Sequence, residues 1–330
     1  MLYFPASHPL GLCRKACYLS AGFFFSGGGM KYTKRPLTFD EQVEQMVTRG
    51  LEGDPARIRN RLQSVNYYRL TGYLYPYRIQ GSDNFVPGTQ FETVWEQYAF
   101  DRRLRLLVMD AIERIEIAVR AQLAYHHAHA YQDPFAYVTR PISLPDMKPE
   151  AYADFLERVD EEASRSKKDT FVEHFFTTYG DEHKYLPVWM AVEVMSFGTM
   201  QLFFRGASHR VKQNVASYFG MPDKVFDSWL HALSIVRNIC AHHGRLWNKV
   251  LGVKPMIPWA KDYPDWHSPC PIPNERIFGI LTICRHCLRI IAPQSRWTQC
   301  IGDLLHDFPN VSSPSMGFPK NWKDSPLWKA

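Results

Sequence analysis

The sequence has no apolar run long enough to cross a membrane and no cysteine pattern that suggests a disulfide framework. Its apolar stretches stop short of the roughly 18 residues that a membrane span needs. The seven cysteines are odd in number and scattered along 330 residues, which is typical of a protein in a reducing compartment. We therefore expect a cytoplasmic protein that does not enter the membrane.

Strand-like alternation is also scarce, and internal repeats, low-complexity tracts and a glycine-rich phosphate loop are absent from the sequence. Hydrophobic residues make up 45% of the chain and charged residues 22%, as in an ordinary globular protein. At 330 residues the chain can bury a large core in one domain or two. These features predict an all-α protein, and no sequence motif indicates a cofactor.

Two short runs contain the residue types of a metal site. The first is Cys284-Arg-His-Cys287, with Cys270 and Cys300 at some distance. Apolar residues surround this run at helical spacing, so we expect its thiols to lie in the core. In the His-His-Ala-His run at 126–129, adjacent histidines point in different directions around a helix and seldom share an ion. We expect no metal at either run.

The N-terminal 29 residues resemble a weak signal peptide, with a basic start, a short apolar run and small residues after it. Because polar and small residues interrupt the run, we expect residues 1–33 to be a tail that is disordered or precedes the true translation start. Residues 34–250 are expected to form one helical domain. Residues 251–330 are expected to form a C-terminal helical extension packed on its core.

Apolar residues recur at helical spacing along most of the chain. In the N-terminal part we expect a helix from a capping box at Thr38–Glu41 to about Gly50, a second helix after Asp54-Pro55, and a long helix or a kinked pair from Phe91 to about Tyr125. In the middle of the chain we expect one or two helices within 151–179 and a helix from Pro187 to Met195, with a break at Phe197-Gly198. The last two expected helices run from Phe226 to His243, where Gly244 ends the helix, and from Glu275 to about Ile291. Gly72, Pro76 and Gly81 predict an aromatic loop or a short extended segment in between.

Basic and aromatic residues concentrate between residues 30 and 78. The chain has a formal net charge of +6, and this stretch has nine Lys and Arg residues against five Asp and Glu, with tyrosines interleaved. Such a combination is typical of nucleic-acid binding. Arg69 and Arg78 are candidates for contacts with RNA phosphate. The alternative is that the tyrosines pack against helices while the arginines are solvated.

The sharpest candidate for chemistry is the stretch VRNICAHHGRLWN, with Arg237, Asn238 and His242. Arginine has a permanent forked charge for a phosphate, and histidine can accept or donate a proton near neutral pH. The amide of Asn238 could hold the imidazole or a phosphate oxygen. His243 is a second candidate, although its spacing from Trp229, Leu233, Val236 and Cys240 predicts that it faces the core.

The spacing of this motif poses a geometric problem. On a straight helix Arg237 and His242 lie about 140° apart, so their side chains would not touch. A working site then needs a bend near Cys240, long side chains that curl round the helix, or a second copy of the chain. The last option favours a homodimer. The alternative interpretation is a polar helix end without chemistry.

Two further groups of residues are weaker candidates. Glu116, Arg120 and His127 recur on one helix and either belong to the site or form a buried polar network that fixes helix packing. Arg245 is a candidate phosphate contact. Trp247 either stacks on an RNA base or plugs the end of its helix, and the plug is the preferred interpretation.

Five blocks of the chain, in order, resemble the signature blocks of the Abi-like (abortive infection) family. They are PLTFDEQVEQMVTRGL, VNYYRLTGYLYPYR, FDRRLRLLVMDAIERIEIAVRAQLAYHHA, LPVWMAVEVMSFGTMQLFF and SWLHALSIVRNICAHHGRLWN. The resemblance implies a helical bundle of the HEPN type and a motif of Arg, a polar residue and His, which Arg237, Asn238 and His242 match. It also implies a metal-independent endoribonuclease toxin that dimerises and acts on RNA in phage defence. A non-catalytic RNA-binding or regulatory module remains the alternative.

Overall fold

The computed structural model describes residues 32–329, and helices form its regular secondary structure. Within this range there are thirteen α-helices and no β-strand, and all of them lie in the unit Phe39–Ala330. The prediction of an all-α fold is confirmed. The prediction of a tail at residues 1–33 falls almost wholly outside the described residues. No helix among those described is long and apolar enough to cross a membrane.

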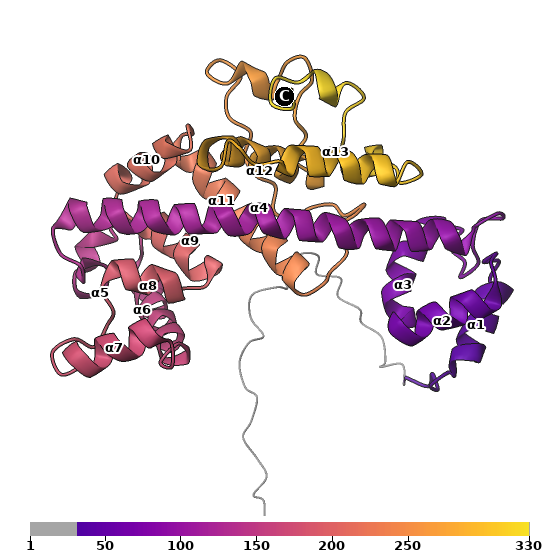
Figure 1. Ribbon diagram of the computed structural model, residues 1–330, viewed down its shortest axis with the longest axis horizontal. Coiled ribbons are helices and arrows are strands. Elements are labelled where there is room, and N and C mark those ends of the chain that lie inside the picture. The colour runs from indigo at the N-terminus through magenta and orange to yellow at the C-terminus, as the bar shows by residue number, and fades with distance from the viewer. Residues whose placement is uncertain (1–31, 330) are drawn as a thin grey trace, which may run out of the picture. The chain divides into compact units, whose positions relative to one another are not determined.

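The longest helix is α4, Phe91–Tyr131, which has 41 residues and runs through the middle of the unit (Figure 1). Its apolar stripe is buried as predicted, from Leu104 to Leu123, although Leu107 is only half-buried. It is a single helix rather than a kinked pair, and it extends six residues beyond the predicted end. Helices α3, α8, α10, α11, α12 and α13 all pack against it. One helix therefore organises the core.

The N-terminal helices are α1, Phe39–Thr48, α2, Pro55–Ser64, and α3, Tyr67–Leu74. The Asp54 side chain accepts a hydrogen bond from Ala56 N and caps α2, as the sequence predicts. The predicted aromatic loop is wrong, because this stretch forms α3. Asn66 caps that helix, and its apolar residues are buried at helical spacing, whereas a side chain at Gly72 would meet open space. The glycine therefore did not interrupt the helix.

The middle of the chain forms seven helices. They are α5, Ala136–Thr139, α6, Pro149–Arg165, α7, Thr170–Tyr179, α8, Val188–Val194, α9, Phe197–Gly206, α10, His209–Tyr218, and α11, Asp223–Ala241. The predicted break at Phe197-Gly198 comes earlier, at Ser196, whose hydroxyl accepts from Thr199 N and caps α9. Phe197 and Gly198 are therefore the first residues of a helix.

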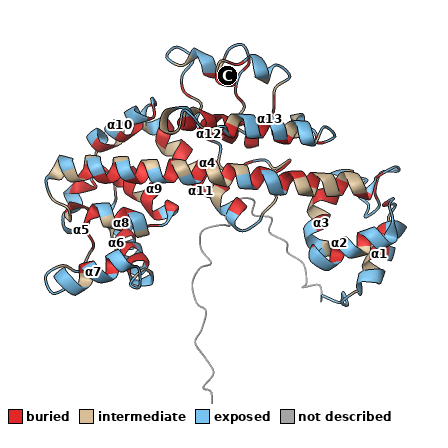
Figure 2. Cartoon of the chain, viewed as in Figure 1, coloured by how far each residue is buried: buried red, intermediate tan, exposed pale blue. Residues whose placement is uncertain are grey.

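The C-terminal helices are α12, Ile277–Ile291, and α13, Trp297–Asp307. Both pack on α4, and α12 is buried along most of its length (Figure 2). Cys284 and Cys287 are fully buried, which confirms that they are core thiols, and burial raises the pKa of both. The residues after 250 thus share one hydrophobic core with α4 and α11.

Candidate active site

The end of α11 places two histidines side by side on the surface. His242 is the C-cap, and its N–H donates to Asn238 O at 3.0 Å. The next two N–H groups complete a Schellman motif, from His243 to Cys240 O at 3.0 Å and from Gly244 to Ile239 O at 2.7 Å.

This helix end corrects two predictions. The left-handed residue of the motif is His243, with φ +57°, whereas the sequence favoured Gly244 as the residue that ends the helix. Gly244 is needed for a different reason, because a Cβ there would lie 3.1 Å from Ile239 Cγ2. His243 is exposed rather than core-facing. The prediction assumed that the helix continued through it, and the left-handed turn removes it from the buried stripe.

Side chains from α3 and α4 hold the segment that follows. Arg69 Nη1 donates to His243 O at 2.5 Å, and Arg105 Nη1 donates to Gly244 O at 3.3 Å. In the opposite direction, Arg245 Nη1 donates to the α3 carbonyl of Gly72 at 2.6 Å. Residues 139 to 174 positions apart in the sequence are therefore joined at this point.

Asp101 is the buried centre of these contacts. Its Oδ1 accepts from Leu246 N at 3.1 Å and from Trp247 N at 2.6 Å, and its Oδ2 accepts from the Tyr73 hydroxyl at 2.5 Å and from Arg105. Its side chain is fully buried. Burial raises the pKa of Asp101, while Arg105 and the other donors oppose that rise. Sequence analysis missed this residue.

Trp247 plugs the end of the helix, as the preferred interpretation held. It is 2% exposed, and its ring stacks on Tyr73 with centroids 6.5 Å apart. The alternative that its ring stacks on an RNA base is wrong for this conformation, because the ring faces are covered. Arg245 remains at the surface side of the same segment.

A cavity of about 340 Å³ opens between α3 and the end of α11. It is lined by Asn66, Tyr68, Arg69, Tyr73, His242, His243, Gly244 and Arg245. No carboxylate is among these eight residues, and neither arginine forms an ion pair with an acidic residue in the described part of the chain. Tyr68 is 83% exposed at its rim. Two guanidinium groups, two imidazoles and an exposed ring suit a nucleic-acid phosphate and its base.

The structure does not bring Arg237 and Asn238 into this cavity. Helix α11 runs to Ala241 without a break, so a bend near Cys240 does not unite Arg237 with His242. Arg237 is half-buried, and its Nη1 lies 3.4 Å from Asn238 Oδ1. Within one chain, the arginines that line this cavity together with His242 are Arg69 and Arg245.

Glu116 and Arg120 form a buried ion pair on α4. Arg120 also donates to the carbonyls of Val192 and Met195, which ties α4 to the end of α8. Fifteen residues along the helix separate Arg120 from Arg105, a distance of about 22 Å along the axis. The pair is therefore a buried polar network at a different place from the cavity at α11.

His127 and Arg78 also lie outside the residues that line this cavity. His127 is fully buried against Phe203, with ring centroids 5.0 Å apart, and burial lowers its pKa to about 4. Arg78 pairs with Asp83 at 3.2 Å, so its charge is partly neutralised. Neither residue contributes to the positive charge beside His242.

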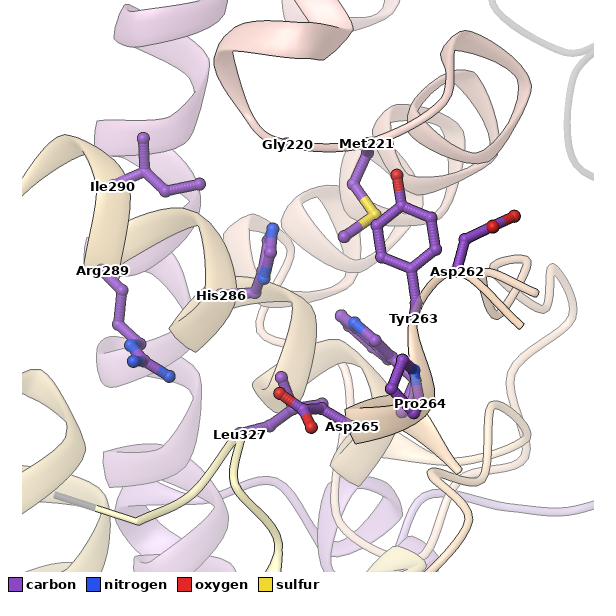
Figure 3. Close-up of a pocket in the computed structure, with 11 residues that line it drawn as sticks. Gly220, Met221, Asp262, Tyr263, Pro264, Asp265, His286, Arg289, Ile290 and Leu327 are labelled. Atoms are coloured by element: carbon purple, nitrogen blue, oxygen red, sulfur yellow. The ribbon is translucent and has the colours of Figure 1, made fainter. Parts of the chain in front are cut away.

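Another cavity, of about 450 Å³, lies between α12 and the segment at Asp262–Trp266 (Figure 3). His286 projects into it, but its Nε2 lies 2.8 Å from Phe219 O, and burial lowers its pKa. Asp262 and Asp265 line it together with Arg289, so the cavity has charges of both signs. It has no pair of free imidazoles and is less suited to a phosphodiester than the cavity at α11.

Comparison with known protein families places this geometry in context. The model of the Abi-like protein family matches residues 60–248, more than half of the chain. The chain belongs to the Abi-like protein family. Asp101 and every residue that lines the cavity at α11 lie within the matched range. Comparisons with curated proteins and with solved structures found no match.

Proposed function

We propose that this Abi-like protein is a metal-independent RNA endonuclease of abortive-infection defence, a toxin with a HEPN-type helical bundle. The observation that carries the proposal is the cavity at α11, where His242 and His243 lie together with Arg69 and Arg245. Its residues supply positive charge for a phosphate and imidazoles for proton transfer, and no carboxylate or thiol lies among them. The basic stretch before α4 supports RNA as the partner.

In the proposed reaction, a ribose 2′-oxygen attacks the adjacent phosphorus while the bond from phosphorus to the 5′-oxygen breaks. The imidazole of His242 accepts the proton of the 2′-hydroxyl, and protonated His243 donates a proton to the leaving 5′-oxygen. Arg69 and Arg245 stabilise the charge that develops on the phosphate oxygens. The products are a 2′,3′-cyclic phosphate and a 5′-hydroxyl end.

Arg237 and Asn238 belong to the proposed site through a second copy of the chain. They do not line the cavity of their own chain, so a homodimer would supply them to the phosphate of the partner. Mixing Arg237→Ala protein with His242→Ala protein tests this arrangement. Partial recovery of cleavage in the mixture is expected for a shared site, and no recovery contradicts it.

The function itself is tested by cleavage of total RNA in the presence of EDTA. Wild-type protein should cleave and leave 2′,3′-cyclic phosphate ends, and His242→Ala should lower the rate by at least about 100-fold. His306→Ala, which removes an exposed histidine of α13, is the matched control. Loss of wild-type activity with EDTA would indicate a metal nuclease. Salt-dependent RNA binding without cleavage would indicate the non-catalytic module.

A further inference from the structure

Helix α11 holds the start of the segment from His243 to Trp247 through the two bonds of the Schellman motif, and side chains bind the rest of its backbone. Arg69 and Arg105 hold its first two carbonyls, and Asp101 holds the N–H groups of Leu246 and Trp247. Because these partners belong to α3 and α4, the position of the two histidines depends on side-chain contacts from other helices.

Asp101 joins three parts of the site at once. One oxygen holds the segment through Leu246 and Trp247, and the other holds α3 through Tyr73 and α4 through Arg105. Helix α3 carries Arg69 and Tyr68, which line the cavity together with the histidines. The carboxylate therefore helps to set the distance between α3 and the imidazoles, together with the direct bonds from Arg69 to His243 O and from Arg245 to Gly72 O.

We propose that Asp101 is a positioning residue of this site, an inference that rests on the proposed nuclease function. Its carboxylate is fully buried and cannot contact RNA, so it acts only through the groups that it holds. A displacement of about 1 Å in a reacting group lowers an enzyme rate by about 100-fold. Loss of the Asp101 contacts should therefore lower kcat. Arg69 and Arg245 keep their own bonds to His243 O and Gly72 O, so the phosphate contacts that govern KM should persist.

Asp101→Asn tests this, because it keeps the shape of the side chain and removes its charge. We expect kcat to fall by about 100-fold with KM changed by less than about threefold. Tyr73→Phe removes one donor to the carboxylate, and kcat should fall by about tenfold. If Asp101→Asn does not fold, the kcat of Tyr73→Phe tests the proposal.

Glu162→Gln is the matched control. Glu162 is a buried carboxylate whose Oε1 accepts from Thr199 Oγ1 at 2.9 Å, between α6 and α9. It should leave kcat within about twofold of wild type, whatever change in Tm the loss of its charge causes. An equal fall in kcat for Glu162→Gln would show that loss of stability, and not positioning, lowers the rate.

Amide hydrogen exchange without RNA separates this inference from the proposed function. Leu246 and Trp247 should lose protection in both Asp101→Asn and Tyr73→Phe, and the imidazole NMR signals of His242 and His243 should shift in the same variants. If wild type does not cleave RNA but these changes occur, the nuclease proposal fails and the anchoring role of Asp101 stands. Retained protection, or retained kcat in both variants, would overturn the inference.

Discussion

The left-handed backbone at His243 allows the imidazole and the conformation of the chain to be tested separately. With φ +57°, this residue occupies a region that glycine adopts freely and that side chains rarely adopt. His243→Gly and His243→Ala both remove the imidazole and retain the backbone groups that bond to Cys240 O and accept from Arg69. Only the glycine variant removes the strain.

The expected difference follows from two opposing effects. A left-handed conformation costs a residue with a Cβ about 1–2 kcal/mol, while glycine loses about 0.5–1 kcal/mol more backbone entropy on folding than alanine does. The glycine variant should therefore be more stable than the alanine variant by about 0.5–1 kcal/mol. For a chain of this size that corresponds to about 1–2 °C in Tm. Because His243 is exposed, loss of packing adds little to either variant.

Urea unfolding and RNA cleavage, measured on both variants, give two independent readouts. Stability should follow the order glycine above alanine, while cleavage should fall by about 100-fold or more in both, because neither has the general acid. Equal stabilities would refute the assignment of strain to His243. Wild-type cleavage rates in both variants would remove His243 from the proposed chemistry and leave His242 as the only histidine in the cavity that transfers a proton.

Two further predictions concern His127 in the core and Tyr68 at the rim of the cavity. Burial lowers the pKa of His127 to about 4 from 6.5, so the unfolded state binds the proton first and stability is lost as pH falls from 6.5 towards 4. Chemical unfolding should show a loss of about 2 kcal/mol between pH 7 and pH 5 that His127→Phe removes; an unchanged slope in that variant would contradict the argument. Tyr68→Ala should raise KM for RNA about 5- to 100-fold through loss of base stacking. Tyr75→Ala, on a ring that is 69% exposed and outside the cavity, should not; equal effects would show that Tyr68 has no special role.

Much of the fold follows from periodicity, because burial on one face of a helix repeats every three or four residues. The stripe from Leu104 to Leu123 predicted the central helix for this reason, and α2 followed from the Asp54-Pro55 cap and the spacing of its apolar residues. Helix α3 was missed because glycine and proline near its end were given more weight than Asn66 and the apolar spacing of Leu70 and Leu74. Glycine and proline in the sequence give no information about the tertiary contacts that stabilise a short helix.

The candidate site was predictable only in part, since its residues come from distant parts of the sequence. His242, His243, Arg245 and Arg69 were each singled out, but their common cavity required the fold. The importance of Asp101 could have been predicted from its position in the sequence. It lies three residues before Leu104 and four before Arg105, in phase with the buried stripe, and an acid at such a position needs partners inside the protein.

The structure leaves Arg237 outside the cavity that His242 lines, although both residues belong to the same sequence motif. Five residues on a helix separate Arg237 from His242 by about 140°, and the unbroken α11 preserves that separation. In the proposed site, a phosphate beside His242 would therefore contact Arg69 of the same chain, and Arg237 would come from a second chain. Because Asp101 fixes α3 against the histidines, the part of the site that one chain can complete is the part that the buried carboxylate controls.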